Sequence, residues 1–182
     1  MDMPVAVVTG ASRGIGFEAA LQLGRVGFAV LAVASDPGRL ADAVQALAAA
    51  GVQTQGTAID VADGGGVARV LGEHPWAQAA DVLVNNAGVM SQRTAKTLRT
   101  DADEWRRVMA VNLDGVFLGT KHSIPLMRES GAGGSIINMS SVAGLKGSAN
   151  LAGYCATKGG VRLFTKSVAM ECANAQDKIR VN

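Results

Sequence analysis

The stretch VAVVTGASRGIG, residues 5–16, joins a short apolar run to a glycine-rich turn. Residues 5–10 have the length and composition of a strand, and Gly10, Gly14 and Gly16 stand where a helix should begin. Glycines at such a place allow a tight turn and let backbone N–H groups approach a pyrophosphate, whose charge a helix N-terminus favours. Because the spacing is TGxxxGxG and not GxGxxG, an ordinary strand-to-helix turn is the alternative at this point.

The alternation of strand and helix continues along the chain. Strand patterns cover 5–10, 28–34, 52–61, 81–88 and 135–141, and helix patterns cover 14–27, 37–51, 65–80, 101–130 and 153–175. Apolar strands that alternate with helices predict an α/β fold, a doubly wound parallel sheet covered on both faces, in a single domain over 1–182. A sixth strand pattern begins at 179 and reaches the last residue, 182, so we expect a truncated chain with an exposed sheet edge.

Composition excludes several functional classes. The chain is 48% apolar with a net charge of +2, and its Lys and Arg residues are scattered, which argues against a nucleic-acid partner. We found no basic leader and no apolar stretch near 20 residues, so we expect a cytoplasmic protein without a membrane partner. Cys155 and Cys172 lie on one predicted helix, and His74 and His122 are isolated, so we predict no metal site.

Three further segments favour a cofactor-binding role for the glycine turn over an ordinary strand-to-helix turn. NNAG at 85–88 ends the fourth strand, Ser141 ends the fifth, and Tyr154 and Lys158 follow on a helix. Together they resemble the short-chain dehydrogenase/reductase family. The resemblance rests on residues spread over almost the whole chain: Thr9, Gly10, Gly14, Gly16, Asp60, Asn85, Asn86, Ala87, Gly88, Asn112, Ser141, Tyr154 and Lys158.

The family resemblance implies a Rossmann fold, a nicotinamide cofactor across the carboxyl ends of the strands, and reversible oxidation of a secondary alcohol to a ketone. It also implies a longer domain, so we expect this chain to lack the last strand and the substrate loop. Its similarity is greatest to secondary-alcohol and hydroxysteroid dehydrogenases, and its cofactor residues resemble those of 3-oxoacyl carrier-protein reductases. The substrate, a small alcohol or ketone, is not fixed by these residues.

Tyr154 and Lys158 lie one helical turn apart and therefore on the same face of a helix. A tyrosine can give or take the hydroxyl proton of the substrate, and a nearby ammonium favours its phenolate form. Spacing alone favours the alternative, a half-buried tyrosine and a surface lysine. The resemblance makes Tyr154 the general acid or base and gives Lys158 a second role at the nicotinamide ribose.

Two other residues complete the predicted catalytic set. Ser141 can donate to the substrate oxygen from the end of its strand, and the alternation of side chains sends Ser140 to the opposite face. The resemblance assigns Asn112 to a water that links Lys158 to solvent. The alternative for Asn112 is a buried amide that the backbone satisfies.

The predicted cofactor site follows from the same resemblance. Asp60 is expected to accept from the adenine amine, although a turn residue at the end of a strand is its alternative. The residues expected at the cofactor are Gly10, Ser12, Arg13, Gly14, Ile15, Gly16, Ser35, Asp60, Val61, Asn86, Ala87 and Gly88, together with Tyr154 and Lys158.

The end of the second strand bears on the choice of cofactor. The family resemblance implies that the acid that selects NAD ends the second strand, a position that here holds Ala34. Ala34 leaves room for a 2′-phosphate that Ser35 and Arg13 could hold. Asp36, followed by Pro37, is better explained as the N-cap of the next helix. We therefore expect NADP(H) rather than NAD(H).

The two long helices carry apolar residues on more than one face, including Val116, Phe117, Leu163 and Phe164, which favours an oligomer. The family resemblance implies a homodimer or homotetramer. Two alternatives to an enzyme are a catalytically silent cofactor-binding regulatory module and a structural fragment that needs a partner. A pure sensor would need only the glycine turn and the ribose contacts. The presence of Asn112, Ser141, Tyr154 and Lys158 therefore favours the enzyme.

Overall fold

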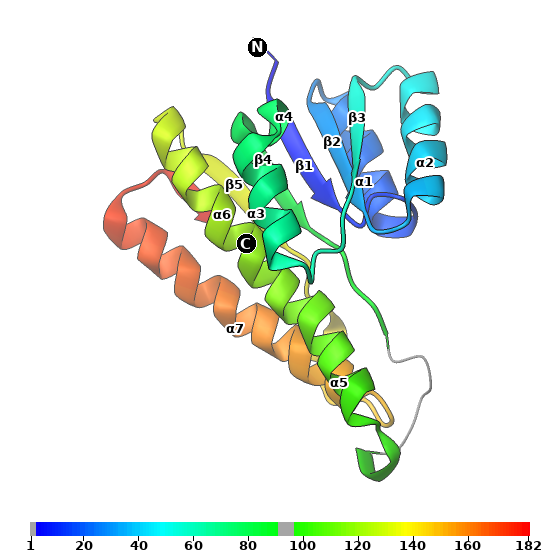
Figure 1. Ribbon diagram of the computed structural model, residues 1–182. Helices are drawn as coiled ribbons and strands as arrows, with labels where there is room; N and C mark the ends of the chain where they lie inside the picture. Colours follow the sequence, from blue (N-terminus) through cyan, green and yellow to red (C-terminus); the bar gives the residue numbers. More distant parts are fainter. Residues whose placement is uncertain (1–2, 91–96) are drawn as a thin grey trace.

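The chain forms one parallel sheet, as the sequence predicts. The structure, a computed structural model, describes residues 3–90 and 97–182. The strand order is β3-β2-β1-β4-β5-β6, and every pair is parallel (Figure 1). The strands are β1 (Val5–Thr9), β2 (Ala29–Ala34), β3 (Thr54–Ala58), β4 (Ala80–Asn85), β5 (Gly134–Asn138) and β6 (Ile179–Val181).

Helices cover both faces of this sheet. The helices are α1 (Gly14–Arg25), α2 (Pro37–Ala49), α3 (Gly64–Glu73), α4 (Pro75–Gln78), α5 (Ala102–Met109), α6 (Gly115–Ser130) and α7 (Ala152–Ala175). Short helical turns are η1 (Thr97–Arg99), the π-helical η2 (Ala110–Asp114) and η3 (Val142–Gly144). Within the described ranges, no helix is both long and apolar enough to cross a lipid bilayer.

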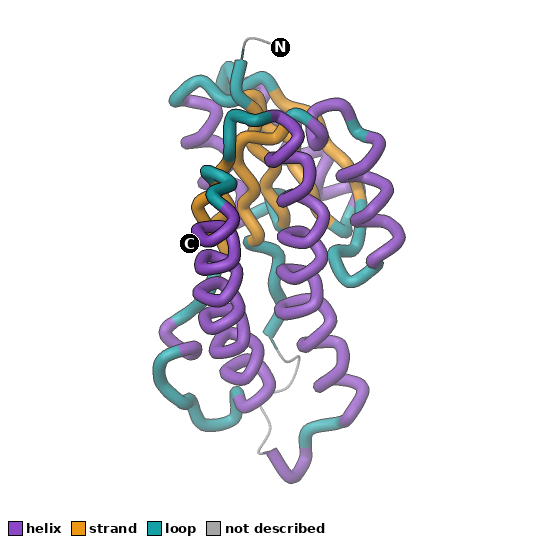
Figure 2. The backbone as a smooth tube through the Cα atoms, turned by 90° about the vertical axis from the view of Figure 1, so that its left-hand side faces the viewer, coloured by secondary structure: helices purple, strands orange, loops and turns teal. Residues whose placement is uncertain are grey.

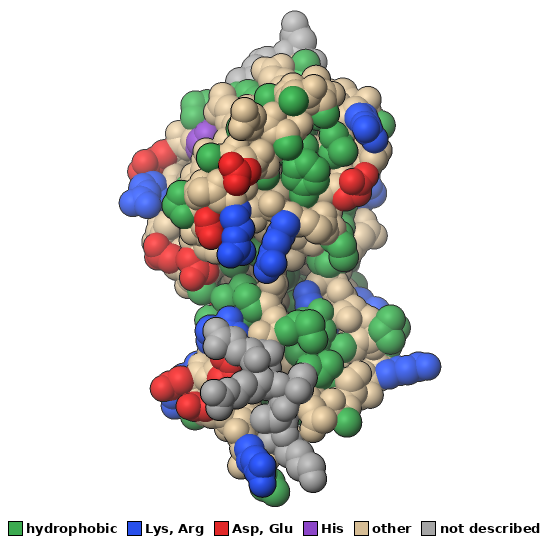
Figure 3. Space-filling view, turned by 90° about the vertical axis from the view of Figure 1, so that its right-hand side faces the viewer, with side chains coloured by type: hydrophobic (Ala, Val, Ile, Leu, Met, Phe, Trp, Pro, Cys, Tyr) green, Lys and Arg blue, Asp and Glu red, His purple; other side chains and the backbone are tan. Residues whose placement is uncertain are grey.

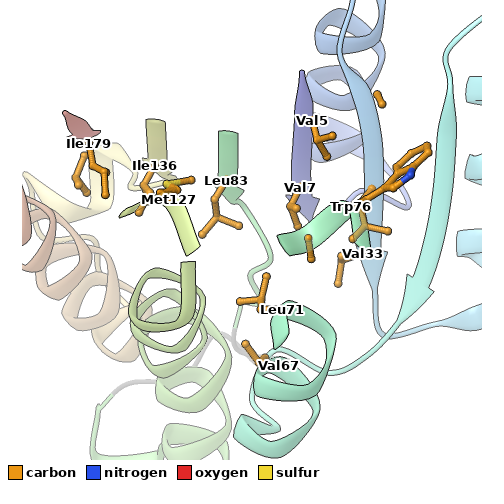
Figure 4. Close-up of a cluster of buried hydrophobic side chains, with 14 of the residues drawn as sticks. Val5, Val7, Val33, Val67, Leu71, Trp76, Leu83, Met127, Ile136 and Ile179 are labelled. Carbon is orange, nitrogen blue, oxygen red and sulfur yellow. The ribbon is translucent and has the colours of Figure 1, made fainter. Parts of the chain in front are cut away.

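Side chains that alternate along the strands build two cores. Val7, Leu83 and Ile136 point to the side of α3, α6 and α7, where they share one cluster with Leu71 and Met127 (Figure 4). The intervening strand residues share a second cluster with α1 and α2. This two-sided burial explains why the central strands read as continuous apolar runs and confirms the doubly wound fold.

Several element boundaries differ from the sequence prediction. The predicted helix over 65–80 is divided before Pro75, whose ring disfavours a helical residue at 74. The predicted helix over 101–130 contains the π-helical turn η2. The predicted strand over 52–61 is shorter, and the exposed polar residues of β3 fit its place at the edge of the sheet.

The strands predicted over 81–88 and 135–141 also end early, at Asn85 and Asn138. Residues 86–88 and 139–141 are therefore loops at the carboxyl edge of the sheet. Helices α5 and α7 extend past this edge (Figures 1 and 2). The residues predicted to work together are thereby gathered beside one edge.

Candidate active site

A cavity of about 670 Å³ lies at the carboxyl edge of the sheet. This volume is within the usual range for small-molecule sites. In Figure 3 the surface narrows and is hollowed between an upper and a lower part, with basic side chains at the upper rim. The predicted cofactor residues that line the cavity are Gly10, Ser12, Arg13, Gly14, Ile15, Ser35, Asp60, Val61, Asn86, Ala87 and Gly88.

The glycine turn has the geometry that requires glycine. Gly10 and Gly14 have positive φ angles of 67° and 58°. A Cβ on Gly16 would lie 2.5 Å from Asn86 Nδ2 and closer still to the carbonyl oxygen of Gly10. Helix α1 begins after Arg13 without a side-chain cap, and its first residues Gly14 and Ile15 line the cavity, so N–H groups of this helix start are available to a ligand.

Thr9 holds the glycine turn against the loop that follows β4. Its hydroxyl donates to the carbonyl of Val84 (3.2 Å) and accepts from the backbone N–H groups of Asn86 and Ala87, both at 3.0 Å. The Asn86 amide donates back to the carbonyl of Thr9 (3.1 Å). These bonds bring the turn and residues 86–88 to the same wall of the cavity.

Asp60 is a turn residue that also lines the cavity. Its Oδ1 accepts from the N–H of Ala62 at 3.0 Å, which is the behaviour of a turn residue. Asp60 and Val61 also line the cavity. The turn therefore holds this carboxylate at the cavity wall.

Two charged residues that follow β2, Asp36 and Arg39, line the cavity. Asp36 is the N-cap of α2, as predicted, and its Oδ1 accepts from the N–H of Arg39 at 2.9 Å. The Arg39 Nε also lies 3.3 Å from Asp36 Oδ2, and both residues line the cavity with Arg13 and Ser35. The sequence analysis missed Arg39, although its place in the first turn of the helix after β2 could have indicated it.

Lys158 and Tyr154 lie together on α7, beyond the Gly88 end of the cavity. Lys158 is 4% exposed, its Nζ donates to the carbonyl of Met139 at 2.6 Å, and Nζ lies 5.8 Å from the centroid of the Tyr154 ring. Burial lowers the pKa of Lys158. A Cβ on Gly88 would lie 3.8 Å from Lys158 Nζ, and Gly88 also lines the cavity. Gly88 therefore lies between the cavity and Lys158.

The two serines after β5 have different partners. Ser141 caps η3, with its Oγ accepting from the N–H of Ala143 at 3.2 Å. Ser140 Oγ donates to the carbonyl of Lys158 at 2.9 Å. The segment 139–140 therefore holds Lys158 at both its ammonium and its backbone, a contact that the sequence analysis did not predict.

Asn112 is fully buried in the turn η2. Its Oδ1 accepts from the N–H of Val89 (2.7 Å), and its Nδ2 donates to the carbonyl of Val89 (2.8 Å) and to Thr157 Oγ1 (3.3 Å). Its side chain is thus a buried amide bound largely to backbone, the alternative considered above. The sequence analysis left Thr157 unassigned.

The charged side chains that line the cavity, within the described part of the chain, are three arginines and two aspartates. Among residues 3–90 and 97–182 we find no cluster of three or more His, Cys, Asp or Glu side chains. Backbone donors, three arginines (Arg13, Arg39 and Arg107) and the glycine turn suit a phosphate-bearing ligand. These residues fit a dinucleotide.

Comparison with known proteins gives the same assignment. The model of the short chain dehydrogenase family matches residues 4–182. A 3-oxoacyl-[acyl-carrier-protein] reductase of Synechocystis sp. is 41% identical over 172 residues, with 93% of this chain and 68% of the relative covered. A trans-4-hydroxycyclohexanecarboxylate dehydrogenase of Sinomonas cyclohexanicum is 39% identical, with 98% and 69% covered.

A third relative and a solved structure extend this comparison. The NADP-dependent (R)-specific alcohol dehydrogenase of Lentilactobacillus kefiri is 46% identical over 100 residues, which cover 55% of this chain and 39% of the relative. The crystal structure of an actinorhodin polyketide ketoreductase variant with NADPH superposes with a TM-score of 0.92 at 36% identity, covering all of this chain and 69% of the other. The chain thus covers about two thirds of the length of the proteins that match nearly all of it. It belongs to the short-chain dehydrogenase family.

Proposed function

We propose that this protein is an NADP(H)-dependent oxidoreductase that interconverts a secondary alcohol and a ketone. The observation that carries the proposal is the pair Tyr154 and Lys158 beside Gly88, at the end of a cavity suited to a dinucleotide. The Lys158 ammonium is buried against a carbonyl oxygen, so its position is fixed. A surface lysine would lack such a constraint.

The bound nicotinamide would supply or accept the hydride. In the direction of reduction, the Tyr154 hydroxyl gives its proton to the substrate oxygen while the carbonyl carbon gains the hydride. The Lys158 ammonium stabilises the phenolate that remains, and Ser141 Oγ donates to the same substrate oxygen. We assign to Asn112 a supporting role, because its buried amide joins Val89 at the cavity wall to Thr157 on the helix that carries Lys158.

Charges beside β2 favour NADP(H) over NAD(H). Arg13 and Arg39 line the cavity with Ser35, and Ala34 leaves the end of the strand without an acidic side chain. Arg39 also offsets the negative charge of Asp36. Two relatives agree with this assignment, because one is named NADP-dependent and another was solved with NADPH. A higher kcat/KM with NADPH than with NADH is expected, and a preference for NADH would refute this assignment.

Oxidation of NADPH with a panel of ketones tests the reaction. The panel holds cyclic ketones, methyl ketones and 3-oxoacyl thioesters, and each is assayed with wild type and Tyr154→Phe. Tyr154→Phe should lower turnover by about three orders of magnitude, within the range of general acid catalysis, and keep NADPH affinity. NADPH binding without turnover of any ketone would favour the regulatory module instead.

We also propose that the protein is a homodimer or homotetramer. Phe117 and Leu163 are 44% and 65% exposed on α6 and α7, and contiguous exposed apolar side chains can mark a protein–protein interface. Phe117 also makes an edge-to-face contact with Phe164, which packs against the core, and Val116 is buried, so of the four predicted residues only Phe117 and Leu163 are exposed. A second copy of the chain would bury this surface.

A further inference from the structure

Two threonines on α7 repeat the same bonding pattern. Thr157 Oγ1 donates to the carbonyl of Tyr154 (2.8 Å) and accepts from Asn112 Nδ2 (3.3 Å). Eight residues later, Thr165 Oγ1 donates to the carbonyl of Val161 (2.7 Å) and accepts from the Nδ2 of Asn138 (3.0 Å). Each threonine thus joins the backbone of the helix to an asparagine on another element.

The Thr157 pair differs from the Thr165 pair in what it connects. Asn112 also binds the N–H and the carbonyl of Val89, so both donors and the acceptor of its amide are engaged. Val89 lines the cavity directly after Gly88. A continuous set of bonds therefore runs from the cavity wall through Asn112 and Thr157 to the main chain of Tyr154.

Burial makes this set of bonds sensitive to the loss of one hydroxyl. Thr157 and Asn112 are both 0% exposed. Without the hydroxyl, one N–H of the Asn112 amide would lose its partner away from water, which is costly. The amide would turn or the helix would shift to relieve this cost, and either change moves Tyr154 relative to Val89.

We infer that Thr157 is a positioning residue that sets Tyr154 and Lys158 against the cavity wall at Gly88 and Val89. The inference rests on the proposed function for its effect on turnover. Its effect on the place of the Tyr154 ring does not depend on any substrate. Displacements of about 1 Å can cost a reaction about 100-fold, so a small shift of this helix turn would be measurable.

Three variants and one reserve variant test the inference. Thr157→Val removes the hydroxyl and keeps the shape, and Thr157→Ser keeps the hydroxyl. Thr165→Val is the matched control, because it removes the same bonding pattern from the same helix at a distance from Tyr154. Thr157→Ala serves as a second variant without the hydroxyl should Thr157→Val not fold.

Turnover and NADPH affinity form one readout. For Thr157→Val we expect kcat to fall about tenfold or more while the Kd for NADPH changes less than about threefold. Thr157→Ser and Thr165→Val should keep kcat within about threefold of wild type. An equal loss of kcat in Thr165→Val, or no recovery in Thr157→Ser, would overturn the inference.

The ring resonances of Tyr154 form the second readout. The chain contains a single tyrosine, so selective isotope labelling of tyrosine reports on Tyr154 alone. These resonances should move in Thr157→Val and stay in place in Thr165→Val; unmoved resonances in Thr157→Val would overturn the inference. If wild type turns over no ketone, the proposed function fails, and this readout still decides the role of Thr157.

Discussion

Replacing Gly16 and Gly72 by alanine should have opposite effects, although the chemical change is the same. Both glycines lie in helices, Gly16 in α1 and Gly72 in α3. A Cβ on Gly16 would lie 2.5 Å from Asn86 Nδ2 and closer still to the carbonyl oxygen of Gly10. A Cβ on Gly72 would have no atom within 4 Å.

The expected magnitudes follow from these distances. Nonbonded carbon contacts are favourable near 3.5–4.0 Å, so the overlap at Gly16 is about 1 Å. Asn86 cannot yield easily because its amide binds the carbonyl of Thr9, and the other contact is backbone. Overpacking of this kind costs about 1–3 kcal/mol, of which the higher helix propensity of alanine offsets up to about 1 kcal/mol. Gly72→Ala should stabilise the fold by about 0.5–1 kcal/mol.

Urea unfolding and NADPH titration measure both variants. Gly16→Ala should lose about 1–2 kcal/mol of unfolding free energy and weaken NADPH binding about tenfold or more, because the shifted helix misplaces the donors of the turn. Gly72→Ala should gain stability and bind NADPH as wild type does. Normal binding by Gly16→Ala, or a destabilised Gly72→Ala, would refute the close packing that we describe.

Three further predictions concern charge, cofactor choice and assembly. Burial lowers the pKa of Lys158 in the folded chain, whereas in the unfolded chain it keeps its ordinary value of 10.5. Between these two pKa values the unfolded chain binds more protons than the folded chain. The unfolding free energy of wild type minus that of Lys158→Met should therefore rise with pH in this window. A difference from urea unfolding that stays flat or falls with pH would contradict the lowered pKa of Lys158. Arg39→Ala and Arg13→Ala should each weaken NADPH binding about tenfold, since a charge-assisted hydrogen bond is worth about 1.5–3 kcal/mol. Calorimetry should find NADH binding nearly unchanged in both variants. Equal losses of affinity for both cofactors would count against a 2′-phosphate site. Wild type should sediment as a dimer or tetramer and Leu163→Glu should shift toward monomer, whereas a monomeric wild type would exclude the proposed assembly.

The fold could be predicted from the sequence because its strongest signals are local. The apolar runs of β1, β2 and β4 are buried on both faces, and the glycine turn sets the start of α1. The π-helical turn at 110–114 carries no such local signal, since the periodicity around it stays helical. The edge strand β3 was placed only approximately, because exposed polar residues do not follow an apolar pattern.

The candidate site was partly predictable for a different reason. The resemblance to a family named the cofactor and catalytic residues, and most of the former line one cavity. Thr157 and Ser140 escaped the sequence analysis because their contacts join distant segments, whereas Arg39 has a local position in the first turn of the helix after β2 that could have indicated it. A hydroxyl beside a known residue has many possible partners, and only the packing of α7 against β5 and η2 selects one.

Transfer of deuterium tests the central claim most directly. NADPH deuterated at the transferable position is incubated with the wild-type protein and the best ketone of the panel, and the alcohol is analysed by mass spectrometry. The account predicts one deuterium at the carbinol carbon with wild type, and almost none with Tyr154→Phe despite unchanged NADPH binding. Alcohol without deuterium, or equal deuterium with Tyr154→Phe, would contradict hydride transfer assisted by Tyr154.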